Sequence, residues 1–345
     1  MSAFTAIAGT RRAALLTLGS AALAQASPAW AKKKLWRIAE IKHVSHAALD
    51  ADERGFVAGL LSTGLKEGED FVIVRFDGQG DLQQVREMAN QISAQPFDLV
   101  HSIATTPSQA VLRTGNKRPL VFSSVTDPVH AQLVPVNGAS GSKSGTNVTG
   151  VSDLWPVEMQ LRTYARIVPT ARVWGTIYNP AESNAIVHLS RMHAVAQRLG
   201  LTLLEAKVRN MAEVPVAADN LLQRVQALTI TSDNTTVARM AELAQLCGAR
   251  RIPLFAGDVE SVERGAVAAY GLDYYLVGYA AGRKAALVMK GVPVGAIAWG
   301  PVEKFSLTLN LQAAQAQGVV FEPDILAKAD KIIPLSNTPE AGTAL

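Results

Sequence analysis

Short apolar runs of the kind that form β-strands recur from Leu35 onward, and most are separated by segments of helical periodicity. One such segment places Leu82, Val85, Ala89 and Ile92 three or four residues apart, which forms one apolar face of a helix. Strands that alternate with helices are typical of parallel sheets covered by helices on both faces. The strand-like runs are 35–41, 71–76, 97–104, 119–125, 172–178, 202–208, 227–232, 252–257, 266–272 and 305–310.

A break in this alternation falls near residues 137–156. It begins with NGASGSKSGTN, a stretch rich in Gly and Ser that reads as a loop, and the strand–helix alternation restarts at Arg172. The pattern therefore predicts two α/β lobes.

The N-terminal segment has the three parts of an export signal. Arg11 and Arg12 precede an apolar run, and Ala29-Trp30-Ala31 provides an A-x-A cleavage site. The arginine pair favours the twin-arginine route, with an ordinary secretory signal as the alternative. Near the cleavage site there is no cysteine for a lipid anchor, and later apolar runs are too short to span a bilayer. We expect residues 1–31 to be removed near Ala31 and the protein to reside in the periplasm.

Composition narrows the range of partners. The chain has 345 residues, of which 48% are apolar, and its formal net charge is +4 without a basic stripe interleaved with aromatics. This distribution argues against nucleic acid as a partner. Cys247, the single cysteine, occupies an apolar position of a predicted helix and reads as a core residue. Because no His or Cys spacing typical of metal sites occurs, we expect no metal, and we also expect no cofactor. We further expect the protein to be a monomer.

Three segments place a small polar cluster between a strand and a helix: HSIATTPSQAVL, GTIYNPAESNAIVHL and LTITSDNTTVARM. In the first, Thr105 and Thr106 precede Pro107, which suits the first position of a helix. The threonines can cap that helix. Alternatively, their hydroxyls and the free helix N–H groups can hold an anion such as a carboxylate.

Acidic residues also follow the predicted strands. Asp127, Asp233 and Asp258 each come just after an apolar run, where open α/β sheets bind ligands. Each can act as a cap or turn former, or can receive an ammonium group. Asn234 extends this polar turn, and His46 lies between the first predicted strand and helix, where it reads as structural or ligand-facing.

The turn NPAESNA is the densest of these clusters. Glu182, Ser183 and Asn184 supply more hydrogen-bonding groups than capping requires, which favours a ligand role. Hydroxyls and helix N-termini suit a carboxylate, and the aspartates suit an ammonium. The hypothesis is a pocket for an amino acid. Aromatic residues near the strand ends can offer flat walls to its side chain: Trp155, Tyr178, Tyr270, Tyr274 and Tyr275.

Catalytic signatures are absent from the sequence. There is no G-x-S-x-G elbow, H-E-x-x-H, Walker A or G-x-G-x-x-G motif, and the Ser-x-x-Lys spacing in SGSKSG lies in the predicted loop. An exported hydrolase would need a nucleophile–base pair, and none is evident. We therefore expect no enzyme.

Several longer motifs occur in a fixed order along the chain. They are HAALDADERGFVAGLLSTGLKEG, IATTPSQA, VFSSVTDPVHAQLV, NVTGVSDLWPVEMQL, GTIYNPAESNA, TSDNTTV, GAVAAYGLDYYLVG and LTLNLQAAQAQG. In these motifs and their order, from about Trp36 to Gly318, the chain resembles the ABC-transporter substrate-binding proteins of the type that includes the tryptophan/tyrosine-binding lipoproteins. Here the lipobox of some relatives is missing, and Ser-Asn replaces the more usual Asn-Ser in NPAESNA.

The resemblance implies a type I periplasmic binding protein, with two doubly wound parallel-sheet lobes joined by three hinge strands. The hinges would lie near Val151–Leu154, Gly271–Tyr274 and Lys304–Thr308. The first lobe would comprise 32–152 with about 274–304, and the second 153–273 with about 305–333, followed by a tail at 334–345. The ligand-facing candidates would be His46, Thr105, Thr106, Asp127, Ser183, Asn184, Asp233, Asn234 and Asp258.

The implied function is that of an ABC importer's solute receptor. The lobes would close on a small ligand, such as an amino acid with an aromatic side chain, and the closed form would deliver it to a membrane permease. A ligand sensor for a membrane kinase or chemoreceptor would use the same fold and pocket, so that alternative stays open.

Overall fold

The structure is a computed structural model that describes residues 34–136, 138–302 and 304–335. The chain divides into two units, 1–34 and 35–345, and the second is described here. The predicted export signal at 1–31 and all but two residues of the predicted tail at 334–345 lie outside the described residues. No helix in the described ranges is long and apolar enough to cross a membrane.

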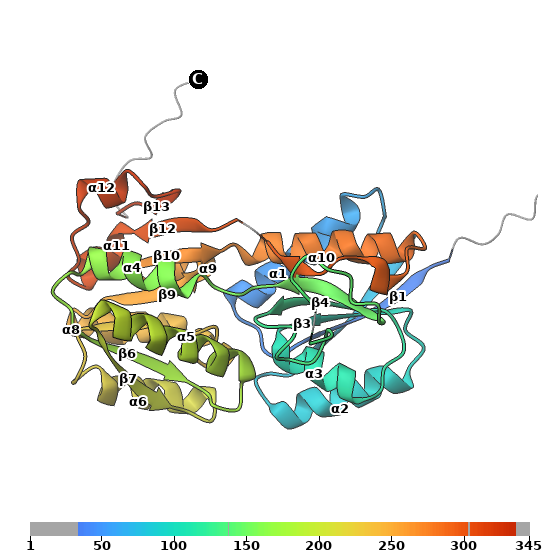
Figure 1. Cartoon of the computed structure of the whole chain (residues 1–345), viewed down its shortest axis with the longest axis horizontal. Helices are drawn as coiled ribbons and strands as arrows, with labels where there is room; N and C mark the ends of the chain where they lie inside the picture. Colours follow the sequence, from blue (N-terminus) through green and yellow to red (C-terminus); the bar gives the residue numbers. More distant parts are fainter. Residues whose placement is uncertain (1–33, 137, 303, 336–345) are drawn as a thin grey trace, which may run out of the picture. The chain divides into compact units, whose positions relative to one another are not determined.

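The first sheet has six parallel strands in the order β11-β5-β4-β3-β1-β2. One apolar core lies between this sheet and helices α1 and α10, and another lies beneath α2 and α3. Figure 1 shows the two pairs of helices on opposite faces of the sheet. The elements are β1 (Trp36–Lys42), α1 (Ala47–Leu61), β2 (Phe71–Asp77), α2 (Leu82–Ala94), β3 (Leu99–Ile103), α3 (Thr105–Arg113), β4 (Leu120–Val125), β5 (Val148–Ser152), α10 (Tyr274–Met289), η2 (Val294–Ala296) and β11 (Gly300–Pro301).

The second sheet has seven strands in the order β13-β12-β10-β9-β8-β6-β7, and β10 and β12 are its one antiparallel pair. Its cores lie against α6 and α8 on one side and against α4 and α11 on the other. Its elements are α4 (Val157–Ile167), β6 (Val173–Tyr178), α5 (Ser183–Leu199), β7 (Thr202–Lys207), η1 (Met211–Glu213), α6 (Val214–Leu221), β8 (Ala227–Thr229), α7 (Asn234–Val237), α8 (Met240–Arg250), β9 (Leu254–Asp258), α9 (Val259–Glu263), β10 (Ala268–Leu272), β12 (Ser306–Asn310), α11 (Leu311–Ala316), α12 (Pro323–Leu326) and β13 (Lys331–Ile333).

The predicted α/β class with two parallel-dominated sheets is confirmed. Each of the ten predicted strand-like runs contains a strand, whereas β5, β11 and β13 were not predicted. β5 lies inside the interval assigned to the break, and β11 and β13 are only 2 and 3 residues long. Runs this short carry no period-2 signal, so pairing with a neighbouring strand is what defines them.

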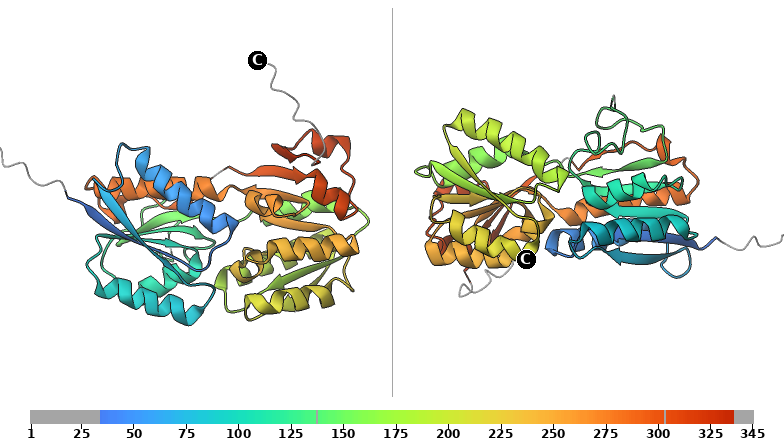
Figure 2. Two further views of the ribbon diagram at one scale, coloured as in Figure 1. Left: turned by 180° about the vertical axis from the view of Figure 1, so that it is seen from behind. Right: turned by 90° about the horizontal axis from the view of Figure 1, so that it is seen from below.

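The chain passes between the sheets three times: after β5 at 153–156, between β10 and α10 at residue 273, and between the end of β11 at Pro301 and the start of β12 at Ser306. We call the first sheet with its helices lobe 1 and the second sheet with its helices lobe 2. Figure 2 shows how α10 returns to lobe 1, where it packs along α1, while the C-terminal elements remain with lobe 2. The passages bring residues of both lobes together at the carboxyl ends of the strands.

Candidate functional site

A small cavity lies where side chains from both lobes meet. Its volume is about 10 Å³, which is room for roughly one water molecule. Lobe 1 and the passages contribute His46, Ala48, Leu49, Ser124, Thr126, Asp153, Trp155 and Tyr274, and lobe 2 contributes Asn184, Ser232, Asn234, Val237 and Asp258. The cavity therefore lies at the carboxyl ends of the strands, as ligand sites of open α/β sheets do.

His46 links the two lobes and is held as a neutral side chain. It is the N-cap of α1, with Nδ1 accepting from the Leu49 N–H, and its Nε2 lies 3.2 Å from Oδ1 of Asn234. The Asn234 amide nitrogen donates to Glu182 at 2.6 Å, so its oxygen faces His46 and accepts from the Nε2–H. Burial lowers the pKa of His46 to about 4. At neutral pH His46 is therefore an uncharged donor across the interlobe contact.

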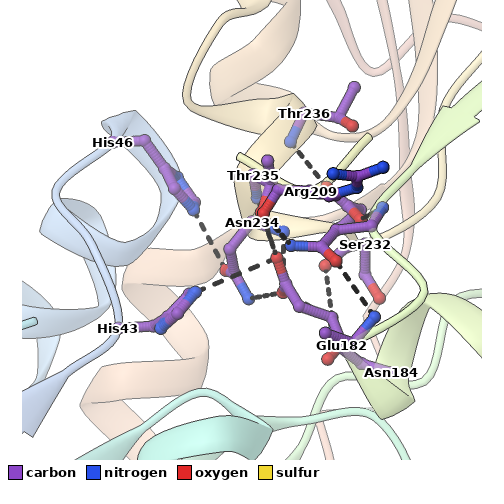
Figure 3. Close-up of polar contacts among 12 residues, drawn as sticks. His43, His46, Glu182, Asn184, Arg209, Ser232, Asn234, Thr235 and Thr236 are labelled. Atoms are coloured by element: carbon purple, nitrogen blue, oxygen red, sulfur yellow. Dashed lines mark hydrogen bonds and ion pairs between the residues drawn. The ribbon is translucent and has the colours of Figure 1, made fainter. Parts of the chain in front are cut away.

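Glu182 is a fully buried carboxylate that organises the lobe 2 wall (Figure 3). Oε1 accepts from the Thr235 N–H at 2.9 Å and the Thr235 hydroxyl at 2.8 Å, and Oε2 accepts from the Asn234 N–H at 3.0 Å. His43 of lobe 1 approaches Oε1 to 3.9 Å. Burial alone would raise the pKa of Glu182, but His43 and these hydrogen bonds outweigh it and hold the pKa below its ordinary value. Glu182 therefore carries its charge at neutral pH.

Asp233 lies beneath this wall rather than on it. It is the N-cap of α7, where Oδ1 accepts from the Thr236 N–H at 2.6 Å and Oδ2 accepts from the Asn179 N–H. Burial and the neighbouring charge of Glu182 raise the pKa of Asp233 well above its usual range. Its geometry is that of a buried cap that supports Asn234.

Asp153 and two aromatic side chains form the wall at the passages between the lobes. Asp153 accepts from the Tyr274 hydroxyl at 2.5 Å and from the Thr126 hydroxyl at 3.1 Å. The Trp155 indole donates to the Tyr274 oxygen at 3.2 Å. A Cβ at Gly257 would lie 2.0 Å from the Trp155 ring, so only glycine leaves room for this ring at the end of β9.

Asp258 adds a second buried carboxyl group. It is the N-cap of α9 and accepts from the Ser261 N–H at 2.7 Å and the Ser261 hydroxyl at 2.8 Å. Burial raises the pKa of Asp258 to about 6, because the hydrogen bonds from Ser261 only partly offset it and the charge of Asp153 raises the pKa further. Burial also raises the pKa of Asp153. Two such carboxyl groups at one cavity favour a cationic group on the ligand.

Four of the nine predicted site residues, namely His46, Asn184, Asn234 and Asp258, line the cavity. Asp233 lies behind Asn234. Thr105, Thr106, Asp127 and Ser183 are not among the lining residues.

Asp127 accepts from the N–H groups of Val129 and His130, as a turn former does. Ser183 is the first residue of α5, and its buried hydroxyl has no hydrogen-bond partner in the described part of the chain.

The start of α3 differs from the prediction in one respect. The helix begins at Thr105, so Pro107 is its third residue rather than its first, and Ala104 at the N-cap position has φ 81° and makes no side-chain cap bond. The Thr105 hydroxyl is buried and unpartnered among the described residues. The threonines therefore do not act as the predicted cap.

Sequence reasoning missed four polar lining residues: Ser124, Thr126, Asp153 and Ser232. Thr126 and Asp153 immediately follow β4 and β5, so the strand-end argument that singled out Asp127 and Asp258 also applies to them. Asp153 falls within the hinge expected near Val151–Leu154, but no apolar run was recognised before it, so it was not singled out as ligand-facing. Ser232 was assigned to a strand, whereas β8 ends at Thr229.

The site offers binding groups. Within residues 34–136, 138–302 and 304–335, no group of three or more His, Cys, Asp or Glu side chains is placed to hold a metal ion. Its polar atoms are hydroxyls, amides and carboxyls from both lobes, flanked by Trp155, Tyr274 and Val237. These polar groups and apolar side chains together can bind a small polar ligand that also has a flat apolar part.

Comparison with known proteins identifies the family of the chain. Residues 37–333 match a family model described as ABC transporter substrate binding protein. Over 284 residues the chain is 30% identical to a tyrosine-binding protein of Clostridioides difficile (strain R20291), covering 82% of this chain and 81% of that one.

Solved structures agree. A conserved domain protein from Vibrio cholerae is 30% identical, with TM-score 0.83 over 87% of this chain and 100% of that one. An ABC domain from Streptococcus pneumoniae in complex with L-Trp is 26% identical, with TM-score 0.81 over 87% and 100% of the two chains. The ligand-free, open structure of a substrate binding protein with adhesive properties from Clostridium difficile is 27% identical, with TM-score 0.63 over 87% and 99%. The chain belongs to the family of ABC transporter substrate binding proteins, which bind solutes and are not enzymes.

Proposed function

We propose that this protein is the extracytoplasmic receptor of an ABC importer and binds an amino acid with an aromatic side chain between its lobes. The observation that carries the proposal is the interlobe cavity, where buried Asp153 and Asp258 lie beside Trp155 and Tyr274. The carboxyl groups suit an ammonium, and the rings suit a flat side chain. A relative named for tyrosine and a similar structure that holds L-Trp support this ligand class.

The proposed mechanism is lobe closure about the three passages, with hinges at 151–154, 271–274 and 304–308. Lobe 1 would comprise 32–152 with about 274–304, and lobe 2 would comprise 153–273 with about 305–333. The structure is more similar to the L-Trp complex, with TM-score 0.81, than to the ligand-free, open structure, with TM-score 0.63, at nearly equal sequence identity. A cavity of about 10 Å³ must open to admit an amino acid. Ligand would then favour the closed form in proportion to its differential affinity.

For the ligand carboxylate we propose the N-terminus of α3, where Thr105 and Thr106 lie and the Thr105 hydroxyl is buried and unpartnered among the described residues. Free N–H groups at the start of a nine-residue helix favour an anion. Ser183 and Asn184 at the start of α5 are the further candidates for the carboxylate from the opposing lobe. Asp127, which follows β4, is a further candidate for the ammonium group.

Delivery requires partners outside this chain. We propose that Arg11 and Arg12 direct export by the twin-arginine route, that cleavage occurs near Ala31, and that the closed receptor docks on a membrane permease as a monomer. Family membership supports the extracytoplasmic location and the transporter context.

The deciding experiment is a thermal-shift screen of residues 32–345 against the amino acids, followed by calorimetry on the hits. At a hundred times its dissociation constant, a ligand that binds only the folded state stabilises it by about 2.7 kcal/mol. Stabilisation by L-tryptophan or L-tyrosine that is smaller in Asp258→Asn than in the wild-type protein supports the proposal. If no amino acid shifts the melting temperature, the ligand class is wrong.

A further inference from the structure

A chain of buried polar side chains lies behind the lobe 1 wall of the cavity. It runs from Glu40 on β1 through His101 on β3, Ser123 on β4 and Asp52 on α1 to Ser124, and each of the five is at most 4% exposed. Only Ser124, the last of them, lines the cavity. The hydrogen bonds among these five side chains determine whether Ser124 presents a donor or an acceptor to a ligand.

Short contacts join these five side chains in sequence. His101 Nδ1 lies 2.9 Å from Glu40 Oε2, and its Nε2 lies 2.9 Å from the Ser123 oxygen. The Ser123 oxygen lies 2.9 Å from Asp52 Oδ1, and the Ser124 hydroxyl donates to Asp52 Oδ2. Asp52 is thus bonded to one hydroxyl at each of its two oxygens.

Two proton arrangements satisfy these contacts when His101 and Asp52 share a single proton. In one, His101 is protonated on both nitrogens, and the Ser123 hydroxyl donates to an ionised Asp52. In the other, Asp52 holds the proton on Oδ1 and donates it to Ser123, whose hydroxyl then donates to neutral His101. The two arrangements contain the same number of protons, and in both Oδ2 of Asp52 accepts from Ser124. The Ser124 proton is therefore committed to Asp52 in either case.

The backbone holds Ser124 in this position. Its φ is 54°, in the left-handed region, and the register between β4 and β5 shifts between Phe122 and Val125. This conformation lets two consecutive serines reach the same carboxyl group, although consecutive residues of a regular strand point to opposite faces. A strained backbone conformation at a ligand site persists when the surrounding structure holds it in place. Here the hydrogen bond from Ser124 to Asp52 keeps Ser124 in the left-handed conformation.

We propose that Ser124 is a hydrogen-bond acceptor for the ligand's ammonium group, and that Asp52 is the positioning residue that prevents it from donating. The inference rests on the proposed amino-acid ligand. The hydroxyls of Thr126 and Tyr274 also donate to a carboxyl group, that of Asp153. The hydroxyls of this wall are thus turned toward carboxyl groups, and the wall selects a donor while rejecting a carboxylate.

Calorimetry with three probes tests the inference: L-tryptophan, tryptamine, which lacks the carboxylate, and indole-3-propionate, which lacks the ammonium. Ser124→Gly removes the hydroxyl and tolerates the positive φ, and Ser124→Ala is the second variant. Both should weaken L-tryptophan and tryptamine roughly tenfold or more, as expected for a lost hydrogen bond to a charged group. Indole-3-propionate should change by less than about twofold, because it offers no such donor.

Asp52→Asn gives a signature that a merely structural role would not produce. The amide can donate to Ser124 and so free its hydroxyl to donate into the cavity, which should weaken tryptamine and strengthen indole-3-propionate. Ser102→Ala is the matched control, because Ser102 is a buried serine on β3 whose hydroxyl pairs with Ser108. It should leave the ratio of the three affinities unchanged.

Equal losses for all probes in the Ser124 variants, or a loss confined to indole-3-propionate, would overturn the acceptor role. If the wild-type protein binds L-tryptophan and L-tyrosine too weakly to detect, the proposed ligand fails instead. An NMR titration of Asp52 then decides the inference without a ligand. Ser124→Gly should raise the pKa of Asp52, since it removes a donor to the ionised form, and an unchanged pKa shows that the hydroxyl is not committed to Asp52.

Discussion

Glu182 shows how one buried carboxylate can hold a wall of the site. It accepts from the backbone of Asn234 and Thr235 and from both of their side chains, with donor distances between 2.6 and 3.0 Å. Glu182→Gln should lower the free energy of unfolding by about 1.5–3 kcal/mol, because its NH₂ group would face N–H donors and hydrogen bonds to a charge would be lost. Urea denaturation measures the change.

Glu87→Gln is the control for this substitution. Glu87 is exposed on α2 and accepts only from Gln83 among the described residues. Surface substitutions of this kind stay within about 0.5 kcal/mol. A loss of similar size in both variants would mean that the hydrogen bonds to Glu182 contribute little.

The raised pKa of Asp258 predicts that the affinity for the proposed ligand depends on pH. Its pKa in the folded, ligand-free protein is raised to about 6, against 3.8 for the model carboxyl group. The folded state therefore binds this proton more tightly than the unfolded state does. The group costs stability increasingly as pH rises through the window from 3.8 to about 6. An ammonium group binds the ionised form, so L-tryptophan should bind about tenfold more weakly at pH 5 than at pH 7.5.

Calorimetry at the two pH values checks this, with indole-3-propionate as the ligand that lacks the ammonium. The affinity for indole-3-propionate should not fall at pH 5. In Asp258→Asn, the affinity for L-tryptophan should fall much less between pH 7.5 and pH 5 than in the wild-type protein, and we assign the remaining fall to Asp153. An affinity for L-tryptophan that is flat between pH 5 and 7.5 would place the ammonium away from both carboxyl groups.

At single residues, the argument from polar side chains that follow long apolar runs singled out Asp258 and Asn234, which line the interlobe cavity. It could not separate a cap that lines the cavity, such as Asp258, from one that lies behind it, such as Asp233. Both are N-caps of short helices after strands, and only the packing of the lobes distinguishes them.

At the scale of elements, the contact between α1 and α10 is unusually close. A Cβ on Gly278 would lie 1.9 Å from the backbone oxygen of Asp52, and one on Gly55 would lie 2.0 Å from that of Tyr275. Because these neighbours are backbone atoms, they cannot rotate away. The contact fixes α1, which brings Ala48 and Leu49 to the cavity, against α10, which begins at the cavity residue Tyr274.

Gly278→Ala should therefore lower the free energy of unfolding by about 2–3 kcal/mol or more, through overpacking between two helix backbones. Gly248→Ala in α8 is the matched control, since its Cβ would meet nothing closer than the Ala316 Cβ at 3.8 Å. There a helical glycine is replaced in open space, and stability should rise by about 0.5–1 kcal/mol. Thermal unfolding of both variants measures the contrast, and the same sign for both would contradict the packing argument.

Elements were predictable where the apolar pattern was long enough to have a period. The ten predicted runs met this condition, whereas β11 and β13 did not. Partners far apart in the sequence were not predictable: the antiparallel pairing of β12 with β10, and the glycines that let α1 meet α10, depend on the order in which the chain returns to each sheet.

At the scale of the whole molecule, the proposed lobe closure predicts that contacts between the lobes set the fraction of the protein in the binding-competent form. His46 meets Asn234 at 3.2 Å, and the Thr126 and Ser232 hydroxyls meet at 3.2 Å. These residues also line the cavity, so substitutions there change closure and ligand contact together. His43 differs, because it approaches Glu182 at 3.9 Å and is not among the lining residues.

His43→Ala should therefore report on closure alone. Apparent affinity falls in proportion to the fraction of the binding-competent form, so removing an interlobe contact should weaken every ligand by the same factor. A contact of about 1–2 kcal/mol corresponds to roughly 5- to 30-fold. Calorimetry should show equal losses for L-tryptophan and tryptamine, and small-angle X-ray scattering should show a larger radius of gyration without ligand that returns to the wild-type value at saturation. Unequal losses of affinity for the two ligands would show that His43 takes part in ligand recognition. If the radius of gyration and both affinities are unchanged, closure does not depend on the contact between His43 and Glu182.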